Sequence, residues 1–181
     1  GRHHHRWRAG NRSRHRRVRA GDRAIPYSLV TALDFALLPA PVTQIPQART
    51  DQVPIALNTW AARELSAKIG DEAEIEFYVW DAVSGLEARS ARFVVDRIVP
   101  IEGAAADRRL APDYPGISAA DSLSDWDPPF PIDLARIRPQ DERYWDELRT
   151  TPKAFIPYER GRDLWSTQYG RATSIRVRVP P

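Results

Sequence analysis

The stretch PIALNTWAARELSAKIGDEAEIEFYVW, residues 54–80, decides the fold class of this chain. Its first apolar residues, IAL, predict a short strand. Asn58 or Thr59 then provides an N-cap for a helix over residues 60–68, and Gly70 closes that helix. A strand followed at once by a capped helix predicts that helices and sheet share one core.

A second strand follows the predicted helix, because apolar and polar side chains begin to alternate. Ile75, Phe77 and Val79 point to one face, and the residues between them point to the other. The turn at residues 82–85 leads into residues 86–99, which alternate in the same way and are rich in β-branched side chains. Together the two runs predict a long hairpin.

On the N-terminal side of this stretch, the segment YSLVTALDF (27–35) predicts another strand, and a loop marked by prolines follows it. Near the other end, residues 153–157, 159–167 and 172–179 predict strand, helix and strand. This second unit weakly repeats the first, since Ala-Arg-Glu-Leu at 62–65 matches Gly-Arg-Asp-Leu at 161–164. The predicted fold class is α+β, with a mixed or antiparallel sheet, short helices and two strand-helix-strand units.

Between these units lies a long excursion, residues 100–139, that is rich in Pro and Asp and shows little periodicity. Its aromatic and aliphatic side chains can pack in a core, so the segment is predicted to be ordered. A short helix over residues 141–149 follows, with Tyr144, Trp145 and Leu148 on one side. Long irregular segments in compact domains are often functional.

The net positive charge of the chain comes entirely from its beginning. Residues 1–23 hold nine Arg against one acid, Asp22, a net of +8, whereas residues 24–181 hold 18 bases and 23 acids, a net of −5. The segment 1–23 is poor in aliphatic side chains, so we expect a disordered Arg/His-rich head followed by one domain over 24–181. The head is interpreted as an arm that binds nucleic acid or as a tag-like addition to the domain.

The residue types that are missing restrict the chemistry. The chain has no Cys, and its four His (His3, His4, His5 and His15) all lie in the head. Thiolate metal sites, Cys nucleophiles and Ser-His-Asp triads are therefore excluded from residues 24–181. Neither Gly-x-Gly-x-x-Gly nor Gly-x-x-x-x-Gly-Lys-Ser/Thr occurs, so nucleotide binding has no support in the sequence.

Two groups of residues remain as candidates for function. The acids Asp121, Asp125, Asp127 and Asp133 are the one candidate for a metal or acid–base site, but their spacing does not fit a calcium loop. Helix capping explains them more simply, and the prediction is no catalytic residue, no metal site and no cofactor. Among the tryptophans, Trp60, Trp145 and Trp165 are predicted to pack in the core, whereas an exposed contact surface is an alternative interpretation for Trp80 and Trp126.

No stretch is long and apolar enough to cross a bilayer, and the basic N-terminus lacks the apolar run of a signal peptide. Three stretches nevertheless resemble one membrane-protein family: IPYSLVTALD (25–34), LNTWAARELSAKIGDEAEIEFYV (57–79) and the long segment from IVPIEGAAADRRL to RTTPKAF (98–155). They resemble the extracytoplasmic, or periplasmic, domain of an FtsX-like, MacB-type ABC transporter permease. The likeness covers about residues 24–179.

The resemblance implies a non-catalytic domain outside the bacterial cell membrane that relays ATP-driven motion of membrane helices to cargo or partner proteins. It implies a permease dimer and an ABC ATPase subunit, which couples through membrane helices that this sequence lacks, so we expect a fragment or an excised domain. The alternative is a soluble nucleic-acid-associated protein that binds through its Arg-rich arm. A carboxylate-based hydrolase has only generic acids to support it.

Overall fold

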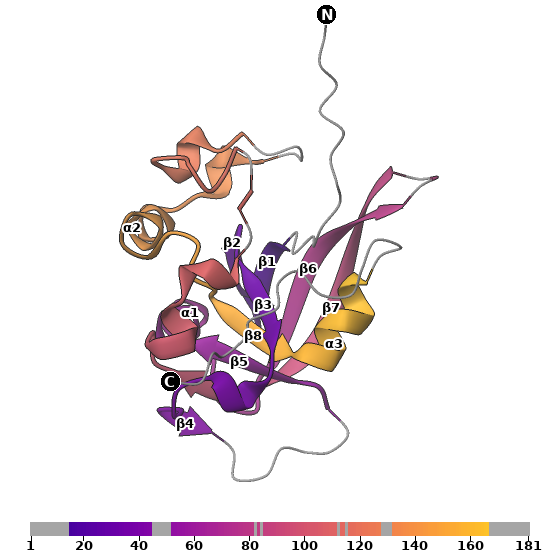
Figure 1. The fold of residues 1–181 in the computed structure, drawn as a ribbon, viewed down its shortest axis with the longest axis vertical. Coiled ribbons are helices and arrows are strands. Elements are labelled where there is room, and N and C mark those ends of the chain that lie inside the picture. The colour runs from indigo at the N-terminus through magenta and orange to yellow at the C-terminus, as the bar shows by residue number, and fades with distance from the viewer. Residues whose placement is uncertain are drawn as a thin grey trace, which may run out of the picture.

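The computed structural model describes residues 15–44, 52–81, 83, 85–111, 113–114, 116–127 and 132–166. These residues form one sheet of eight strands, with three α-helices and five short 3-10 helices around it (Figure 1). The strands are β1 (His15–Ala20), β2 (Arg23–Pro26), β3 (Val30–Leu33), β4 (Thr43–Gln44), β5 (Pro54–Asn58), β6 (Glu72–Asp81), β7 (Gly85–Val99) and β8 (Ala154–Pro157). The helices are α1 (Thr59–Leu65), α2 (Pro139–Leu148) and α3 (Tyr158–Trp165), with η1 (Phe35–Leu37), η2 (Gly103–Ala106), η3 (Arg108–Leu110), η4 (Leu123–Asp125) and η5 (Leu134–Arg136).

The sheet is mixed, as predicted. Its strand order is β2-β1-β6-β7-β5-β8-β3, and β4 pairs with β7 outside this path. The β5–β7 and β3–β8 pairs are parallel, and the other pairs are antiparallel. The α+β class is confirmed, and so is the long hairpin, in which β6 and β7 pair from Glu72 opposite Val94 to Asp81 opposite Gly85.

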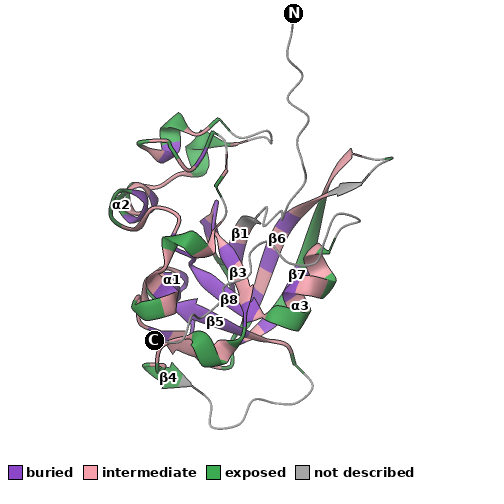
Figure 2. Ribbon diagram, viewed as in Figure 1, coloured by how far each residue is buried: buried purple, intermediate pink, exposed green. Residues whose placement is uncertain are grey.

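Both faces of the sheet are covered at its centre. In β5, Ile55 and Leu57 pack in the main core with α1, whereas Ala56 between them packs in a second core on the opposite face. In β8, Phe155 belongs to that second core, which Phe35, Leu38, Leu110 and Ala105 complete. Strands buried on two faces show continuous apolar runs, which explains why IAL and AFI do not alternate. Figure 2 shows the buried residues concentrated on these central strands.

The helix ends follow local rules, with one correction. Asn58 caps α1, since its side-chain oxygen accepts a hydrogen bond from the Ala61 N–H at 2.7 Å. The helix ends at Ser66, in the left-handed region with φ 52°, and not at Gly70 as the sequence suggested. The Ser66 and Ala67 N–H groups already bond carbonyls of the last helical turn, so no residue further along is needed to close it.

Helix α3 lies close against β3, and Gly161 permits this approach. A Cβ atom at this position would overlap the Cβ of Ala32. The predicted strand 153–157 and helix 159–167 are confirmed as β8 and α3, which begin and end within two residues of the expected limits. The last predicted strand, residues 172–179, lies outside the described residues.

The expected disordered head, residues 1–23, is wrong for its last part. Residues from His15 onward form β1, which pairs with both β2 and β6 and so belongs to the sheet. Val18 is completely buried there, and Arg17 makes an ion pair with Glu76 at 2.7 Å. Sequence composition alone suggested disorder because one apolar residue among arginines carries little signal, but two flanking strands supply its core contacts. Residues 1–14 lie outside the described residues.

The first part of the predicted excursion, with η2 and η3, packs against the sheet, where Ala105 and Leu110 belong to the second core. The later part forms a lobe beside the sheet, which we call the lobe and define as the described residues of 111–152. It contains η4, η5 and α2, and it lies to one side of the sheet in Figure 1. The lobe has a small core of its own, in which Ile117, Leu123 and Trp145 are buried, with Tyr114, Trp126 and Ile137 packed against them.

Candidate functional site

The four acids considered as a metal or acid–base site are Asp121, Asp125, Asp127 and Asp133. The structure gives the side chains of Asp125 and Asp133 separate, local partners. Asp125 accepts a hydrogen bond from the Ser122 hydroxyl at 2.7 Å, and Asp133 caps η5 by accepting one from the Ala135 N–H at 3.2 Å. Within the described ranges, no group of three or more His, Asp or Glu side chains is arranged to hold a metal ion. Asp125 and Asp133 stabilise local turns of the lobe.

The tryptophan predictions have mixed outcomes. Trp145 is buried in the lobe core, and Trp60 and Trp165 are partly buried against the main core, as predicted. The alternative of an exposed contact surface is wrong for Trp126, which is partly buried and stacks edge-on with Trp145 at 4.9 Å between ring centroids. The side chain of Trp80 lies outside the described residues.

A group of buried and half-buried polar side chains, which the sequence did not predict, joins the lobe to the sheet. We call this group the junction and define it by Asn58, Glu64, Arg138, Asp141, Tyr144 and Lys153. Its members come from the end of β5, from α1, from the start of α2 and from the residue before β8.

Lys153 lies at the centre of the junction between two aromatic rings. Its ammonium nitrogen is 4.8 Å from the ring centroid of Tyr144 and 5.1 Å from that of Trp60. The side chain is 5% exposed, and this burial lowers the pKa of Lys153 to about 8. The carboxylates of Asp141 and Glu64 oppose the shift, and the charge of Arg138 adds to it.

Asn58 and Tyr144 form the uncharged part of the junction. The Asn58 amide donates to the Tyr144 hydroxyl at 2.9 Å and to the carbonyl of Pro152 at 3.0 Å. The Tyr144 hydroxyl in turn donates to the carbonyl of Thr151 at 3.0 Å. Burial raises the pKa of Tyr144, although the Asn58 hydrogen bond acts in the opposite direction. Asn58 therefore caps α1 with its oxygen and holds the lobe with its nitrogen.

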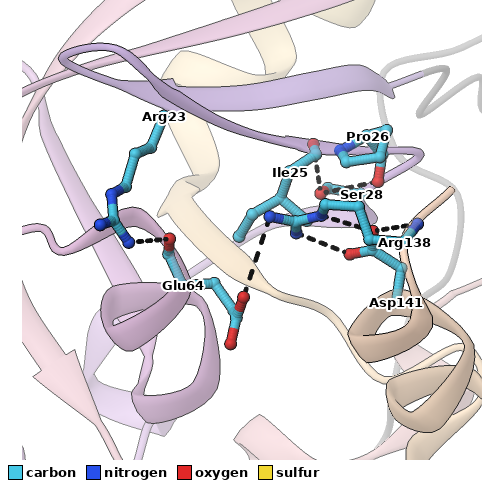
Figure 3. A network of polar contacts seen from close by, with 7 residues as sticks. All are labelled: Arg23, Ile25, Pro26, Ser28, Glu64, Arg138 and Asp141. Carbon is cyan, nitrogen blue, oxygen red and sulfur yellow. Dashed lines mark hydrogen bonds and ion pairs between the residues drawn. The ribbon is translucent and has the colours of Figure 1, made fainter. Parts of the chain in front are cut away.

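Arg138 links α1 and α2 on the charged side of the junction (Figure 3). Its Nε and Nη2 atoms donate to the two carboxylate oxygens of Asp141 at 2.8 and 2.9 Å, and its Nη1 lies 3.9 Å from Glu64. Asp141 is 1% exposed, so this bidentate partner supplies hydrogen bonds that water cannot supply in the interior. Arg23 of β2 donates to the backbone carbonyl of Glu64 at 3.4 Å and extends the network to the sheet edge.

Tyr27 fastens the lobe at a second point. Its hydroxyl accepts a hydrogen bond from the Asp133 N–H at 2.6 Å and donates to the Asp133 carbonyl at 3.2 Å. The backbone of Tyr27 has φ 48°, in the left-handed region that costs a residue with a Cβ roughly 1–2 kcal/mol. The two hydrogen bonds and the edge-on contact with Trp126, at 6.3 Å between centroids, hold the residue in this conformation.

Two clefts open near these contacts. The first, of about 690 Å³, lies beside the β1–β2 turn and is lined by three arginines and four acids: Arg19, Arg23, Arg92, Asp22, Asp71, Glu72 and Glu74, together with smaller residues. The second, of about 370 Å³, lies between Tyr27 and the segment that enters α2. Its charged lining residues are three arginines and one acid, Arg17, Arg136, Arg138 and Asp133.

One sequence signal points to the junction. The chain uses Arg almost exclusively for positive charge, and Lys153 is one of only two lysines. A lysine directly before the apolar run AFIP is an unusual neighbour for a buried strand. The partners of Lys153 are far apart in sequence, however, so their meeting could not be inferred.

The chemistry that the junction can perform is limited by its burial. A lysine with a pKa of about 8 is partly neutral at pH 8 and is then a nucleophile. Lys153 is enclosed by Trp60 and Tyr144 and so does not face a substrate. The junction is suited to holding the lobe in a fixed position against the sheet.

No protein-family model matches this chain, and no curated protein is significantly similar to it. In the part of the chain that the structure describes, no helix has the length and apolar character needed to cross a membrane.

Proposed function

We propose that this chain is the extracytoplasmic domain of an FtsX-like, MacB-type ABC transporter permease and that it relays motion rather than catalysing a reaction. Support comes first from the three resembling stretches, 25–34, 57–79 and 98–155. In the fold these stretches supply β3, the last two residues of β5, α1, most of β6 and the whole lobe. The resembling stretches therefore include parts of the sheet together with the lobe.

The observation that carries the proposal is the way the lobe is attached. The chain leaves the sheet at the end of β7 and returns in β8, and both strands are neighbours of β5. The junction then binds the base of the lobe to the end of β5 through two buried hydrogen bonds of Asn58, and to α1 through the half-buried Arg138–Glu64 ion pair. A domain that transmits motion needs such a connection, because a force on the lobe must reach the sheet without being lost in a flexible hinge.

In this proposal ATP is hydrolysed by a separate ABC ATPase, which fits a chain without a glycine-rich phosphate loop. Membrane helices of the permease connect the two, and a second permease copy completes the transporter. Cargo or a partner protein contacts the domain on the outer side of the membrane.

The first test is the DNA on both sides of this reading frame. The proposal expects encoded segments of about 20 apolar residues on each flank and an ATPase gene nearby. A start codon and a stop codon directly at the ends of the domain, without apolar segments, would contradict it.

The second test places the domain relative to the membrane. Because the chain contains no Cys, Val83→Cys introduces a single thiol at a side chain that is 97% exposed. The full gene product, with any other cysteine replaced, is labelled in intact cells with a maleimide that cannot cross the inner membrane. Labelling in intact cells is expected, with the buried-site variant Ala56→Cys as the unlabelled control. Labelling only after the inner membrane is opened would overturn the proposal.

A further inference from the structure

The cleft of about 370 Å³ between Tyr27 and the start of α2 has the features of a binding site. One wall comes from the β1–β2 hairpin and the residue after it, and the other comes from the segment that leads through η5 into α2. Arg138 and Pro26, which contribute to opposite walls, are both drawn in Figure 3. The volume is at the lower end of the range for small-molecule sites.

The lining of this cleft is positively charged. Arg17, Arg136 and Arg138 face one carboxylate, Asp133, whereas the other acids that bind these arginines lie outside the lining. Those outer partners are Glu76 for Arg17, and Asp141 and Glu64 for Arg138. The cleft thus has three guanidinium groups, of which Arg17 and Arg138 pair with acids outside the lining and Arg136 pairs with Asp133 in its wall.

Each guanidinium has five N–H donors, and the ion pairs use only some of them. Arg136 contacts Asp133 through Nε at 3.0 Å, so among the residues that the structure describes its two terminal nitrogens are the donors that remain. Arg17 contacts Glu76 through Nη2, and its buried Nε has no hydrogen-bond partner among the residues that the structure describes. A buried N–H without an acceptor is costly, and an anion in the cleft would supply one.

The rest of the lining is apolar and rigid. Ala24, Pro26, the ring of Tyr27 and Ile132 complete the walls. Tyr27 is fixed by its two hydrogen bonds to the Asp133 backbone and by its left-handed conformation. Strained backbone of this kind is concentrated at functional sites in proteins.

We propose that this cleft binds a small organic anion, with a carboxylate or phosphate group between the arginines and an apolar body against Pro26, Tyr27 and Ile132. Guanidinium groups match the geometry of both oxyanions, and an ion without an apolar part would leave those walls uncovered. The site is independent of the proposed transport function, because it depends only on residues that line the cleft.

The test is titration of the purified chain with phenyl phosphate and with 4-ethylbenzoate, followed by calorimetry and by amide chemical shifts. Both probes are expected to bind and to change the amide chemical shifts of Tyr27 and Asp133. Their affinity should fall as the salt concentration is raised. Benzyl alcohol, which has the ring without the charge, is expected not to bind. If neither anion binds, or if the alcohol binds equally well, the proposal fails.

Two variants connect binding to the cleft. Arg136→Gln removes a half-exposed guanidinium and is expected to lower the affinity for both probes about tenfold. Asp133→Asn removes the competing carboxylate, can retain the η5 cap, and is expected to tighten binding several-fold. The matched control is Arg162→Gln, since Arg162 pairs with Glu159 at the same i,i+3 spacing on α3.

The outcomes of these variants separate a specific site from general attraction. Equal weakening in the Arg136 and Arg162 variants would show that net charge alone attracts the probes, and would overturn the site. Sedimentation of the chain with anionic phospholipid vesicles, without any binding of the soluble probes, would assign the arginines to a membrane surface instead. That result would also overturn the small-molecule proposal.

Discussion

At the scale of single residues, Lys153 shows what the fold does to an ordinary side chain. A lysine in water has a pKa of 10.5, and the interior lowers it to about 8 because burial removes the water that stabilises its charge. The Tyr144 and Trp60 rings and the carboxylates of Asp141 and Glu64 replace only part of that stabilisation. The charged form of Lys153 therefore reduces the stability of the folded state.

This burial predicts that the protein becomes more stable relative to a Lys153→Met variant as pH rises. Between pH 8 and 10.5 the unfolded state holds more protons on Lys153 than the folded state does, so the free energy of unfolding increases with pH. Below pH 8 both states are protonated and the full penalty applies. Urea unfolding at pH 7 and 10.5 should show the wild type gaining roughly 2–4 kcal/mol on the variant.

The variant serves as the reference because tyrosines and other groups also titrate in this range, and they do so in both proteins. A difference in unfolding free energy that does not change between pH 7 and 10.5 would show that Lys153 keeps an ordinary pKa. A difference that falls with pH would show that its charge stabilises the fold.

At the scale of elements, β1 determines where the folded body begins. The strand lies between β2 and β6 and buries Val18 against the main core. Its arginines also serve the fold, since Arg17 pairs with Glu76 on the neighbouring strand. The folded body thus includes residues that composition assigned to the basic head.

This position of β1 predicts opposite results for two truncations. A chain that starts at residue 15 retains the whole sheet, and its thermal midpoint should stay within about 2 °C of the full chain. A chain that starts at residue 24 loses β1, which leaves the edge of β6 without its partner strand and removes the fully buried Val18. Its free energy of unfolding should fall by at least about 3 kcal/mol. Circular dichroism measures the thermal midpoint during heating and the free energy of unfolding during urea unfolding.

The same pair of truncations tests the nucleic-acid hypothesis without the confusion of unfolding. If the segment 1–14 is a binding arm, the full chain slows the migration of DNA or RNA in a gel in a salt-dependent way and the chain from residue 15 does not.

The stability comparison has its own contrary outcome. Equal stability of the chains that start at residues 15 and 24 would contradict the structural role of β1.

At the scale of the whole molecule, the sheet and the lobe have separate cores but share the junction. The lobe core of Ile117, Leu123 and Trp145 is small, so the lobe depends on the sheet for much of its stability. Arg138 contributes to this dependence, because it pairs with the buried Asp141 of α2 and also lies 3.9 Å from Glu64 of α1 across the junction.

We expect the two parts to unfold together, and we expect Arg138→Gln to separate them. Native-state hydrogen exchange should give amides of α2 and β5 the same opening free energy in the wild type. In Arg138→Gln, α2 should lose about 3 kcal/mol of protection, since Asp141 is left without its partner, while β5 changes less. Arg143→Gln, on the exposed side of α2, is the control and should leave both unchanged.

Separate opening of α2 in the wild type would contradict the fixed connection between lobe and sheet. It would also remove the observation that carries the proposed relay function. An equal loss of protection at α2 and β5 in Arg138→Gln would show instead that the junction stabilises one cooperative unit that cannot be divided.

Much of the fold could be predicted from local signals. The alternation of Ile75 and Phe77, the capping residue Asn58 and the turn before β7 each depend on neighbours within a few positions, and the structure confirms the elements that they indicate. The candidate site could not be predicted in the same way. The acids that stood out in the sequence, such as Asp125, proved to be caps and turn residues of the lobe.

Four features follow from the residues alone: the α+β class, the β6–β7 hairpin, the core tryptophans and the absence of Cys and of His beyond residue 15. Only the tertiary structure decided that β1 belongs to the sheet, that Trp126 packs inside the lobe, and that Lys153 meets Tyr144 and Asp141. Secondary structure follows from hydrogen bonds and side-chain periodicity over a few residues. Burial and electrostatics depend on which distant segments pack together, because a side chain loses its water only when those segments close around it.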